Sequence, residues 1–128
     1  MKTKILIPIY NDWQSVFKLL ENIDLQLYDW DSEVSVLIIN DASTEKKPNN
    51  NFGFKNLKSV QIINMKKNWG HTRCIAAGLK YINEKKEFDY VIPMDGDGED
   101  RPEEIKKFIQ LSKQSIDRSI VGERTKRS

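Results

Sequence analysis

Short apolar runs that end in polar turns alternate along this chain with segments whose apolar residues recur at helical spacing. The runs span residues 4–9, 34–39, 60–65 and 89–94, and a further candidate spans 119–122. Their length and β-branched content are typical of strands, whereas the intervening periodicity predicts helices. Strands that alternate with helices predict an α/β fold, a mainly parallel Rossmann-like sheet with right-handed crossovers and helices on both faces.

The apolar faces of the predicted helices define which residues should enter the core. The faces comprise Val16, Phe17, Leu19, Leu20 and Ile23 in the first helix, and Ile75, Ala76, Leu79 and Ile82 in the second. Asn11 or Asp12 can cap the first helix, Cys74 should pack inside the second, and Pro102 suits the start of a third. Residues 46–56, rich in Asn, Lys and Gly, predict an exposed loop.

Length and composition narrow the class of protein. The 128 residues fit one domain, 1–128, and a net charge of +2 gives no reason to expect nucleic acid as a partner. Cys74 is the single cysteine, so no intrachain disulfide can form. No apolar run approaches the roughly 18 residues of a membrane span, and the first apolar run is too short for a signal peptide. We expect a cytoplasmic protein.

Six acidic side chains fall within ten residues directly after the run 89–94, beginning with Asp95-Gly96-Asp97. Clustered carboxylates repel one another, and a cation between them relieves that cost; hard oxygen ligands suit Mg²⁺ or Mn²⁺. The glycines leave room for a close ligand. A helix–loop–helix calcium loop matches poorly, because Asp100 stands where that loop needs glycine. The alternative is a solvated acidic turn whose carboxylates cap the following helix.

Three polar turns follow predicted strands and should therefore converge on one crevice beyond their carboxyl ends. They carry Tyr10-Asn11, Asn40-Asp41 and Asp95-Asp97. Tyr10 could stack on a base or pack on the surface, and Asn11 could hydrogen-bond to the base. Asp41 could accept hydrogen bonds from a nucleobase or ribose, or close an Asx turn on its own backbone.

The stretch from Asn68 to Arg73 places Gly70, the lone His71 and Arg73 at a helix start, where backbone N–H groups favour anions. Arg73 could reach a diphosphate. The spacing is not that of a P-loop, and zinc lacks ligands. His71 is expected to be structural rather than catalytic. Arg124 belongs to a basic tail that is either solvated or faces phosphates of a donor or a lipid head group.

These motifs together resemble the nucleotide-binding half of inverting family-2 glycosyltransferases with the GT-A fold. The likeness is greatest to polyprenyl-phosphate (dolichyl-phosphate-type) and undecaprenyl-phosphate sugar transferases. It is carried by residues 7–11, 38–44, 68–79, 94–103 and 121–124. It implies a metal-dependent transfer, with inversion, from a UDP- or GDP-sugar, the acceptor being a lipid phosphate at the inner face of a membrane.

The resemblance also implies site residues. Asp95, Asp97 and Glu99 would hold Mn²⁺ or Mg²⁺, with Glu99 where relatives often carry glutamine, and Arg124 would contact phosphate. The nucleotide would contact Pro8, Tyr10, Asn11, Asp41, Gly70, Arg73, Asp95 and Gly96. No catalytic residue is assigned, and a phosphate acceptor, already anionic, needs no general base.

This chain differs from the family in length, because its relatives continue into an acceptor-binding half. The chain is therefore expected to be truncated after the donor-binding half, and to self-associate as a homodimer because apolar surface would be left uncovered. The alternative is a non-catalytic nucleotide or nucleotide-sugar binding module or fragment. A nucleotidyltransferase ranks last, because the turn at Tyr10-Asn11-Asp12 has no glycine to grip a triphosphate.

Overall fold

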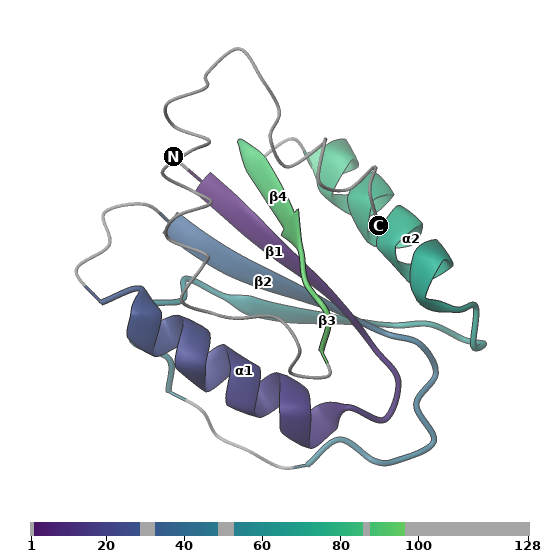
Figure 1. Ribbon diagram of the computed structural model, residues 1–128. Coiled ribbons are helices and arrows are strands. Elements are labelled where there is room, and N and C mark those ends of the chain that lie inside the picture. Colours follow the sequence, from purple (N-terminus) through teal and green to yellow (C-terminus); the bar gives the residue numbers. More distant parts are fainter. Residues whose placement is uncertain (1, 29–32, 49–52, 86–87, 97–128) are drawn as a thin grey trace.

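Four parallel strands form one sheet in the order β3-β2-β1-β4 in the computed structural model (Figure 1). The structure describes residues 2–28, 33–48, 53–85 and 88–96. The elements are β1 (Lys2–Ile9), α1 (Trp13–Gln26), β2 (Glu33–Asn40), β3 (Val60–Asn64), α2 (His71–Lys85) and β4 (Tyr90–Pro93). The predicted third helix, the candidate strand 119–122 and the basic tail lie outside the described residues.

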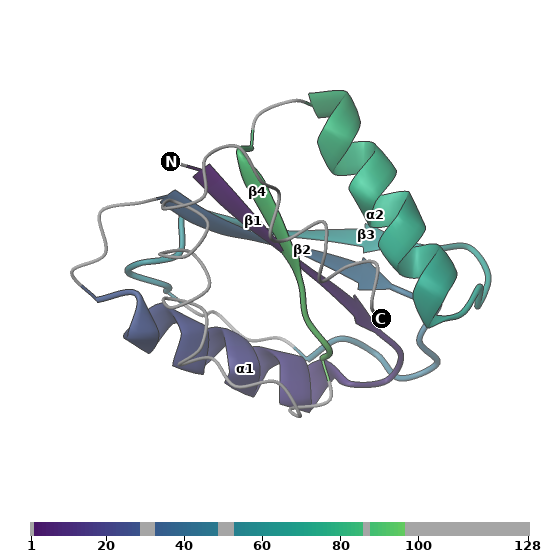
Figure 2. The same ribbon diagram turned by 45° about the horizontal axis from the view of Figure 1, so that its top comes forward.

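The two helices cover opposite faces of the sheet, as both views show (Figures 1 and 2). The connection β1-α1-β2 steps along the sheet in one direction, and β3-α2-β4 steps back past β1 in the other. Because both crossovers take the usual right-handed path, opposite steps place their helices on opposite faces. The predicted α/β fold, with its mainly parallel sheet and two-sided helical cover, is confirmed.

Alternation along β1 divides the core between these two faces. Ile5, Ile7 and Ile9 belong to the cluster beneath α1, whereas Leu6 belongs to the cluster beneath α2. The α1 cluster also holds every predicted apolar residue of that helix: Val16, Phe17, Leu19, Leu20 and Ile23. A strand that is covered on both faces needs a continuous apolar run, which β1 and β2 supply.

The buried face of α2 agrees with the predicted one except at Ala76, because Ile75, Leu79 and Ile82 all pack in the cluster beneath α2. Ala76 is exposed, whereas Cys74, Gly78 and Ile82 are buried. Gly78 lies so close to β1 that a Cβ built on it would stand 2.4 Å from Leu6 Cδ1. Helical periodicity thus predicted Ile75, Leu79 and Ile82 correctly, but it could not identify Gly78, a residue without a side chain that lies against Leu6 of β1.

The loops around α1 are held by hydrogen bonds rather than by the predicted side-chain cap. Asp12 occupies the N-cap position, but its side chain makes no capping hydrogen bond. At the other end, Asp24 Oδ1 accepts hydrogen bonds from the N–H groups of Asn56 (2.7 Å) and Leu57 (2.8 Å). Leu57 is thereby brought into the core beneath α1 at the end of the predicted loop.

Gly78→Val should lower the free energy of unfolding by about 2–3 kcal/mol, because the added branches overpack against Leu6. Chemical denaturation measures this change. Ala76→Val is the matched control: it introduces the same side chain at an exposed position of the same helix and should cost only the propensity difference, under about 1 kcal/mol. Equal costs at the two positions would contradict the packing described for α2.

Candidate functional site

The strand order reverses between β1 and β4, and the candidate site lies at the carboxyl ends of the strands around this point. From β1 the chain proceeds outward to β2 and β3, and then returns to β4 on the other side of β1. Ligands of open parallel sheets bind at such a switch point. Backbone hydrogen bonds from Asp41 N to Ile9 O and from Met94 N to Leu6 O extend the pairing there. The turns that follow β1, β2 and β4 therefore share one edge, as predicted.

Asp41 anchors the start of α2. Its side chain, in a residue only 5% exposed, accepts hydrogen bonds from Trp69 N at Oδ1 (2.7 Å) and from Gly70 N at Oδ2 (2.9 Å). The Asn68 side chain donates to the Asp41 carbonyl (3.3 Å). Gly70 has a φ of 92°, which glycine adopts without steric cost. A carboxylate at a helix N-terminus is also favoured by the helix dipole.

Asn40, rather than Asp41, closes the turn after β2. The side-chain oxygen of Asn40 accepts hydrogen bonds from the backbone N–H (3.1 Å) and the hydroxyl of Ser43. Its amide donates to Asn64 Oδ1 at the end of β3 (2.9 Å). The Asx-turn alternative considered for Asp41 is therefore wrong. Asn40 holds the turn, which leaves the Asp41 carboxylate directed toward α2.

Cys74, in α2, is fully buried next to the Asp41 carboxylate. Burial raises the pKa of its thiol to about 12, and a hydrogen bond to Asp41 and the negative charge of that carboxylate add to the effect. The thiol therefore stays protonated and packs against the sheet. The predicted packing role of Cys74 is confirmed.

Asp95 and His71 face each other across the site. His71 Nε2 lies 3.3 Å from Asp95 Oδ1, and both side chains are about half exposed. His71 is the first residue of α2, and Asp95 follows β4. The next residue, Gly96, is buried against β1, where an added Cβ would lie 2.7 Å from Ile9 Cγ2. Close packing of the backbone thus accounts for one of the two glycines in the acidic turn.

Arg73 and Trp69 pair at the mouth of the site. The guanidinium carbon of Arg73 lies 5.0 Å from the centre of the Trp69 ring, within the range of a cation–π interaction. Trp69 is 46% exposed, and Arg73 is exposed as well. A cation is thus held beside the first turn of α2, where an anionic group would meet it.

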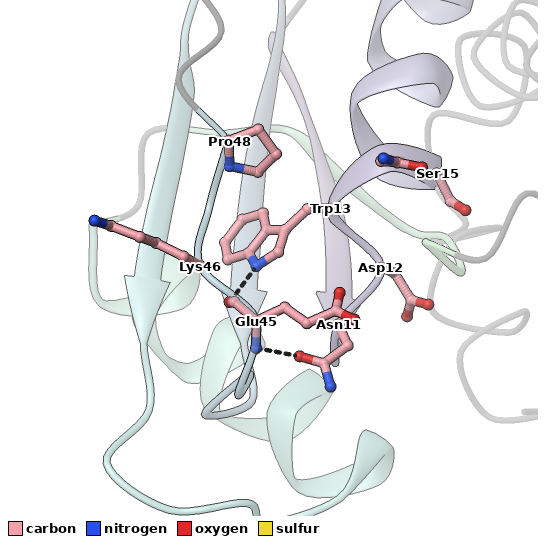
Figure 3. Close-up of a pocket in the computed structure, with 8 residues that line it drawn as sticks. Asn11, Asp12, Trp13, Ser15, Glu45, Lys46 and Pro48 are labelled. Atoms are coloured by element: carbon pink, nitrogen blue, oxygen red, sulfur yellow. Dashed lines mark hydrogen bonds between the residues drawn. The ribbon is translucent and has the colours of Figure 1, made fainter.

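Asn11 joins the turn after β1 to the loop after β2 (Figure 3). It has a φ of 58°, and its side chain accepts from Glu45 N and donates to Thr44 Oγ1, both at 2.9 Å. The Trp13 indole donates to the Glu45 carbonyl (3.1 Å). A pocket of about 500 Å³ opens here, lined by Asn11, Asp12, Trp13, Gln14, Ser15, Glu45, Lys46 and Pro48.

The remaining predicted site residues divide into those that reach this edge and those outside the described part of the chain. Pro8 is buried in β1 opposite Ile39, and Tyr10 is 43% exposed just beyond that strand. Asp97, Glu99 and Arg124 lie outside the described residues. Within residues 2–28, 33–48, 53–85 and 88–96, no group of three or more potential metal-ligating His, Cys, Asp or Glu side chains occurs.

The sequence did not indicate that His71 lies next to Asp95. The available signal was its position directly after Gly70, in a stretch already expected at the carboxyl edge. The strand order was not readable, however, and only that order brings the start of α2 to Asp95 across the end of β1. A single His with no visible partner was therefore interpreted as structural.

The chain belongs to glycosyl transferase family 2, whose family model matches residues 4–128. Two curated relatives are both named undecaprenyl-phosphate 4-deoxy-4-formamido-L-arabinose transferase. The one from Photorhabdus laumondii is 28% identical over 133 residues, which cover 96% of this chain and 37% of the relative. The one from Proteus mirabilis is 26% identical over 125 residues, which cover 96% of this chain and 36% of the relative. The chain thus spans little more than a third of these relatives.

Solved structures agree on the fold. S. aureus TarS superposes with a TM-score of 0.63 at 22% identity, over 89% of this chain and 20% of that one. TarS residues 1–349 in complex with UDP give the same TM-score and identity over 89% of this chain and 32% of that one. At this identity the likeness establishes the GT-A-type fold. In the part of this chain that is described, no helix has the length and apolar character to cross a membrane.

Asp41→Asn should lower the free energy of unfolding by about 1–3 kcal/mol, because an amide NH₂ would face one of the two backbone N–H donors. Urea denaturation followed by circular dichroism measures the change. Asp12→Asn removes the same charge from a side chain that accepts a long hydrogen bond from Tyr10 N (3.4 Å), and it should change stability by less than about 0.5 kcal/mol. An Asp41→Asn variant as stable as the wild type would disprove the anchoring role of Asp41.

The Cys74 thiol should make stability fall at alkaline pH. The unfolded thiol loses its proton near pH 9.0, whereas the folded one keeps it to about pH 12. The unfolded state therefore binds fewer protons in this window, and this contribution, complete below pH 9, is lost as pH rises. Relative to Cys74→Ala, the wild type should lose about 1 kcal/mol between pH 9 and 10. Parallel stability curves for the two proteins would contradict the raised pKa.

Proposed function

We propose that this chain forms the nucleotide-sugar-binding domain, residues 1–128, of an inverting glycosyltransferase that transfers a sugar from a nucleoside diphosphate to a lipid phosphate. The single observation that carries the proposal is the chain of contacts at the carboxyl edge. Asp41 holds Gly70 at 2.9 Å, and the adjacent His71 meets Asp95 at 3.3 Å. The turns after β2 and β4 are thereby joined around the end of β1, where ligands of such sheets bind.

The nucleoside would lie at the ends of β1 and β2. The pocket beside Asn11 has the volume of a small-molecule site and opens at these ends (Figure 3). Tyr10, exposed just beyond β1, offers a ring for stacking. Asp41 follows β2 at the same edge and keeps acceptor capacity beyond its hydrogen bonds from Trp69 N, Gly70 N and the Cys74 thiol, because a carboxylate has about four lone-pair positions.

The diphosphate would lie at the start of α2. The Gly70 N–H is engaged by Asp41, but the N–H groups of the first turn of α2 that follow it have no acceptor within the helix, and the positive end of the helix dipole lies there. Arg73, held over Trp69, adds a positive charge at the same place. The UDP in the TarS complex fits this class of ligand, although it belongs to that protein.

The described donor atoms are compatible with a divalent cation. Asp95 offers a half-exposed carboxylate at the sheet edge, and carboxylate oxygens are the ligands that Mg²⁺ and Mn²⁺ prefer. Asp97 and Glu99, which follow at alternate positions in the sequence, would complete the set of metal ligands. Such an ion, when bound, neutralises negative charge that develops on the departing diphosphate.

The transfer itself needs little from the protein beyond position and charge. An anionic oxygen of the acceptor phosphate would form a bond to the anomeric carbon on the face opposite the leaving group. The bond from that carbon to the donor diphosphate breaks, and the electron pair leaves with the nucleoside diphosphate. The acceptor oxygen carries no proton, so no general base is required. Arg73 and the α2 N-terminus would stabilise the departing charge.

Several finer points belong to the same proposal. The curated relatives carry undecaprenyl-phosphate in their names, which supports a lipid-phosphate acceptor. We place the domain on the cytoplasmic side of a membrane and propose a homodimer as its assembly. The chain spans little more than a third of those relatives. We therefore propose as the alternative function a module that binds the nucleotide sugar without transferring it.

Nucleoside diphosphates should stabilise the chain in a manner that depends on the metal. A ligand at 100 times its Kd adds about 2.7 kcal/mol, which a thermal-shift screen of UDP and GDP with and without Mn²⁺ would detect. Asp97→Ala should abolish the metal-dependent part of the shift. Glu84→Ala, which removes an exposed carboxylate near the other end of α2, should leave it unchanged.

The outcomes separate the two candidate functions. Metal-dependent stabilisation with sugar transfer to a polyprenyl phosphate supports the enzyme, and stabilisation without transfer supports the binding module. No stabilisation by any nucleoside diphosphate, or an Asp97→Ala variant that retains the full shift, would defeat the proposed site.

A further inference from the structure

We propose that His71 is a positioning residue for Asp95: its imidazole holds the first carboxylate of the acidic turn in the orientation that receives the metal–diphosphate unit. This inference rests on the proposed function, because it assigns a role within that site. It concerns a residue that the sequence alone indicated to be structural. The observation behind it is the 3.3 Å approach of His71 Nε2 to Asp95 Oδ1.

The backbones on both sides of this pair are fixed independently. On one side, the Asp41 carboxylate holds the N–H groups of Trp69 and Gly70, and so fixes the residues directly before His71. On the other side, Met94 N donates to Leu6 O (2.9 Å), and Gly96 packs against Ile9. The residues adjacent to the pair are therefore anchored to β2 and β1, and the pair spans the gap between the two anchors.

The chemistry of the pair favours orientation over stability. His71 Nε2 stands at ion-pair distance from Asp95 Oδ1, and because an ionised carboxylate only accepts hydrogen bonds, an imidazole nitrogen that faces it is favoured when it carries a proton. The two side chains are 53% and 45% exposed, and exposed ion pairs of this kind contribute only about 0–1 kcal/mol to folding. Loss of His71 should therefore leave stability nearly unchanged while the carboxylate loses the imidazole that faces Oδ1.

Hydrogen-bond partners of metal-binding carboxylates affect metal affinity, and their removal typically costs 10–100-fold. His71 occupies that place for Asp95. Its role can be imitated by a side chain that carries an N–H donor at similar reach, which glutamine provides and alanine does not. Thr72, the next residue and also exposed, offers a control within the same helical turn.

The test measures Mn²⁺ binding to the whole chain in the presence of saturating UDP or GDP. The electron paramagnetic resonance signal of the free ion reports how much Mn²⁺ remains unbound. We expect Mn²⁺ to bind His71→Ala about tenfold more weakly than the wild type. His71→Gln should bind within about twofold of the wild type, and so should Thr72→Ala. Denaturant unfolding of the four proteins without ligand should agree within about 0.5 kcal/mol, which excludes a merely structural effect.

Three results would overturn the inference. Wild-type affinity in His71→Ala would show that Asp95 needs no positioning. A His71→Gln variant as weak as His71→Ala, together with wild-type ¹⁴N coupling to Mn²⁺, would make His71 a direct ligand instead. Weakened binding accompanied by an equal loss of folding stability would make its role structural. If the wild type itself binds no Mn²⁺–nucleotide, the proposed function fails. That failure is distinguishable from failure of the His71 inference, because the wild-type protein already lacks the binding that the variants are meant to weaken.

Discussion

The arrangement of this site depends on one buried negative charge. Removing the Asp41 carboxylate from water carries a desolvation cost, which is offset here by two backbone N–H groups and by the positive end of the α2 dipole. The same contacts determine where α2 begins, and therefore where His71 and Arg73 stand. They also place the Cys74 thiol against the carboxylate, which adds to the effect of burial in raising the pKa of that thiol. A single acidic residue at the end of β2 thus organises the side of the site formed by α2.

The second constraint is the return of the chain to the far side of β1. This return makes β1 central and separates the turns after β2 and β4, with the end of β1 between them. α2 packs on the face over Leu6, Leu37 and Ile39, so its first residue can contact the turn that follows β4. Two carboxylates that lie far apart in the sequence, Asp41 and Asp95, thereby take part in one set of contacts. Membership of glycosyl transferase family 2 is consistent with a nucleotide-sugar site built in this way.

Prediction from the sequence succeeded where a local pattern has a single solution. The short β-branched apolar runs of β1 and β2 are typical of strands covered on both faces, and the stripe from Val16 to Ile23 is typical of a helix that packs on the core. It failed where a contact overrides the pattern. Ala76 is exposed although the periodicity predicted it to be buried, whereas Gly78 lies against Leu6 of β1, and the Asp12 side chain makes no capping hydrogen bond. Asn40, rather than Asp41, closes the turn after β2, whereas the Asp41 carboxylate is hydrogen-bonded to the start of α2.

The sequence by itself determined the fold class and the edge at which polar chemistry gathers, because strand periodicity and parallel crossovers leave few other arrangements. It also identified the carboxylates after β2 and β4 as candidates, since charged groups directly after buried strands must emerge at that edge. Only the tertiary structure decided which of these groups meet. Strand order is set by packing between segments distant along the chain, and the pairing of His71 with Asp95 and the burial of Asp41 under α2 follow from that order.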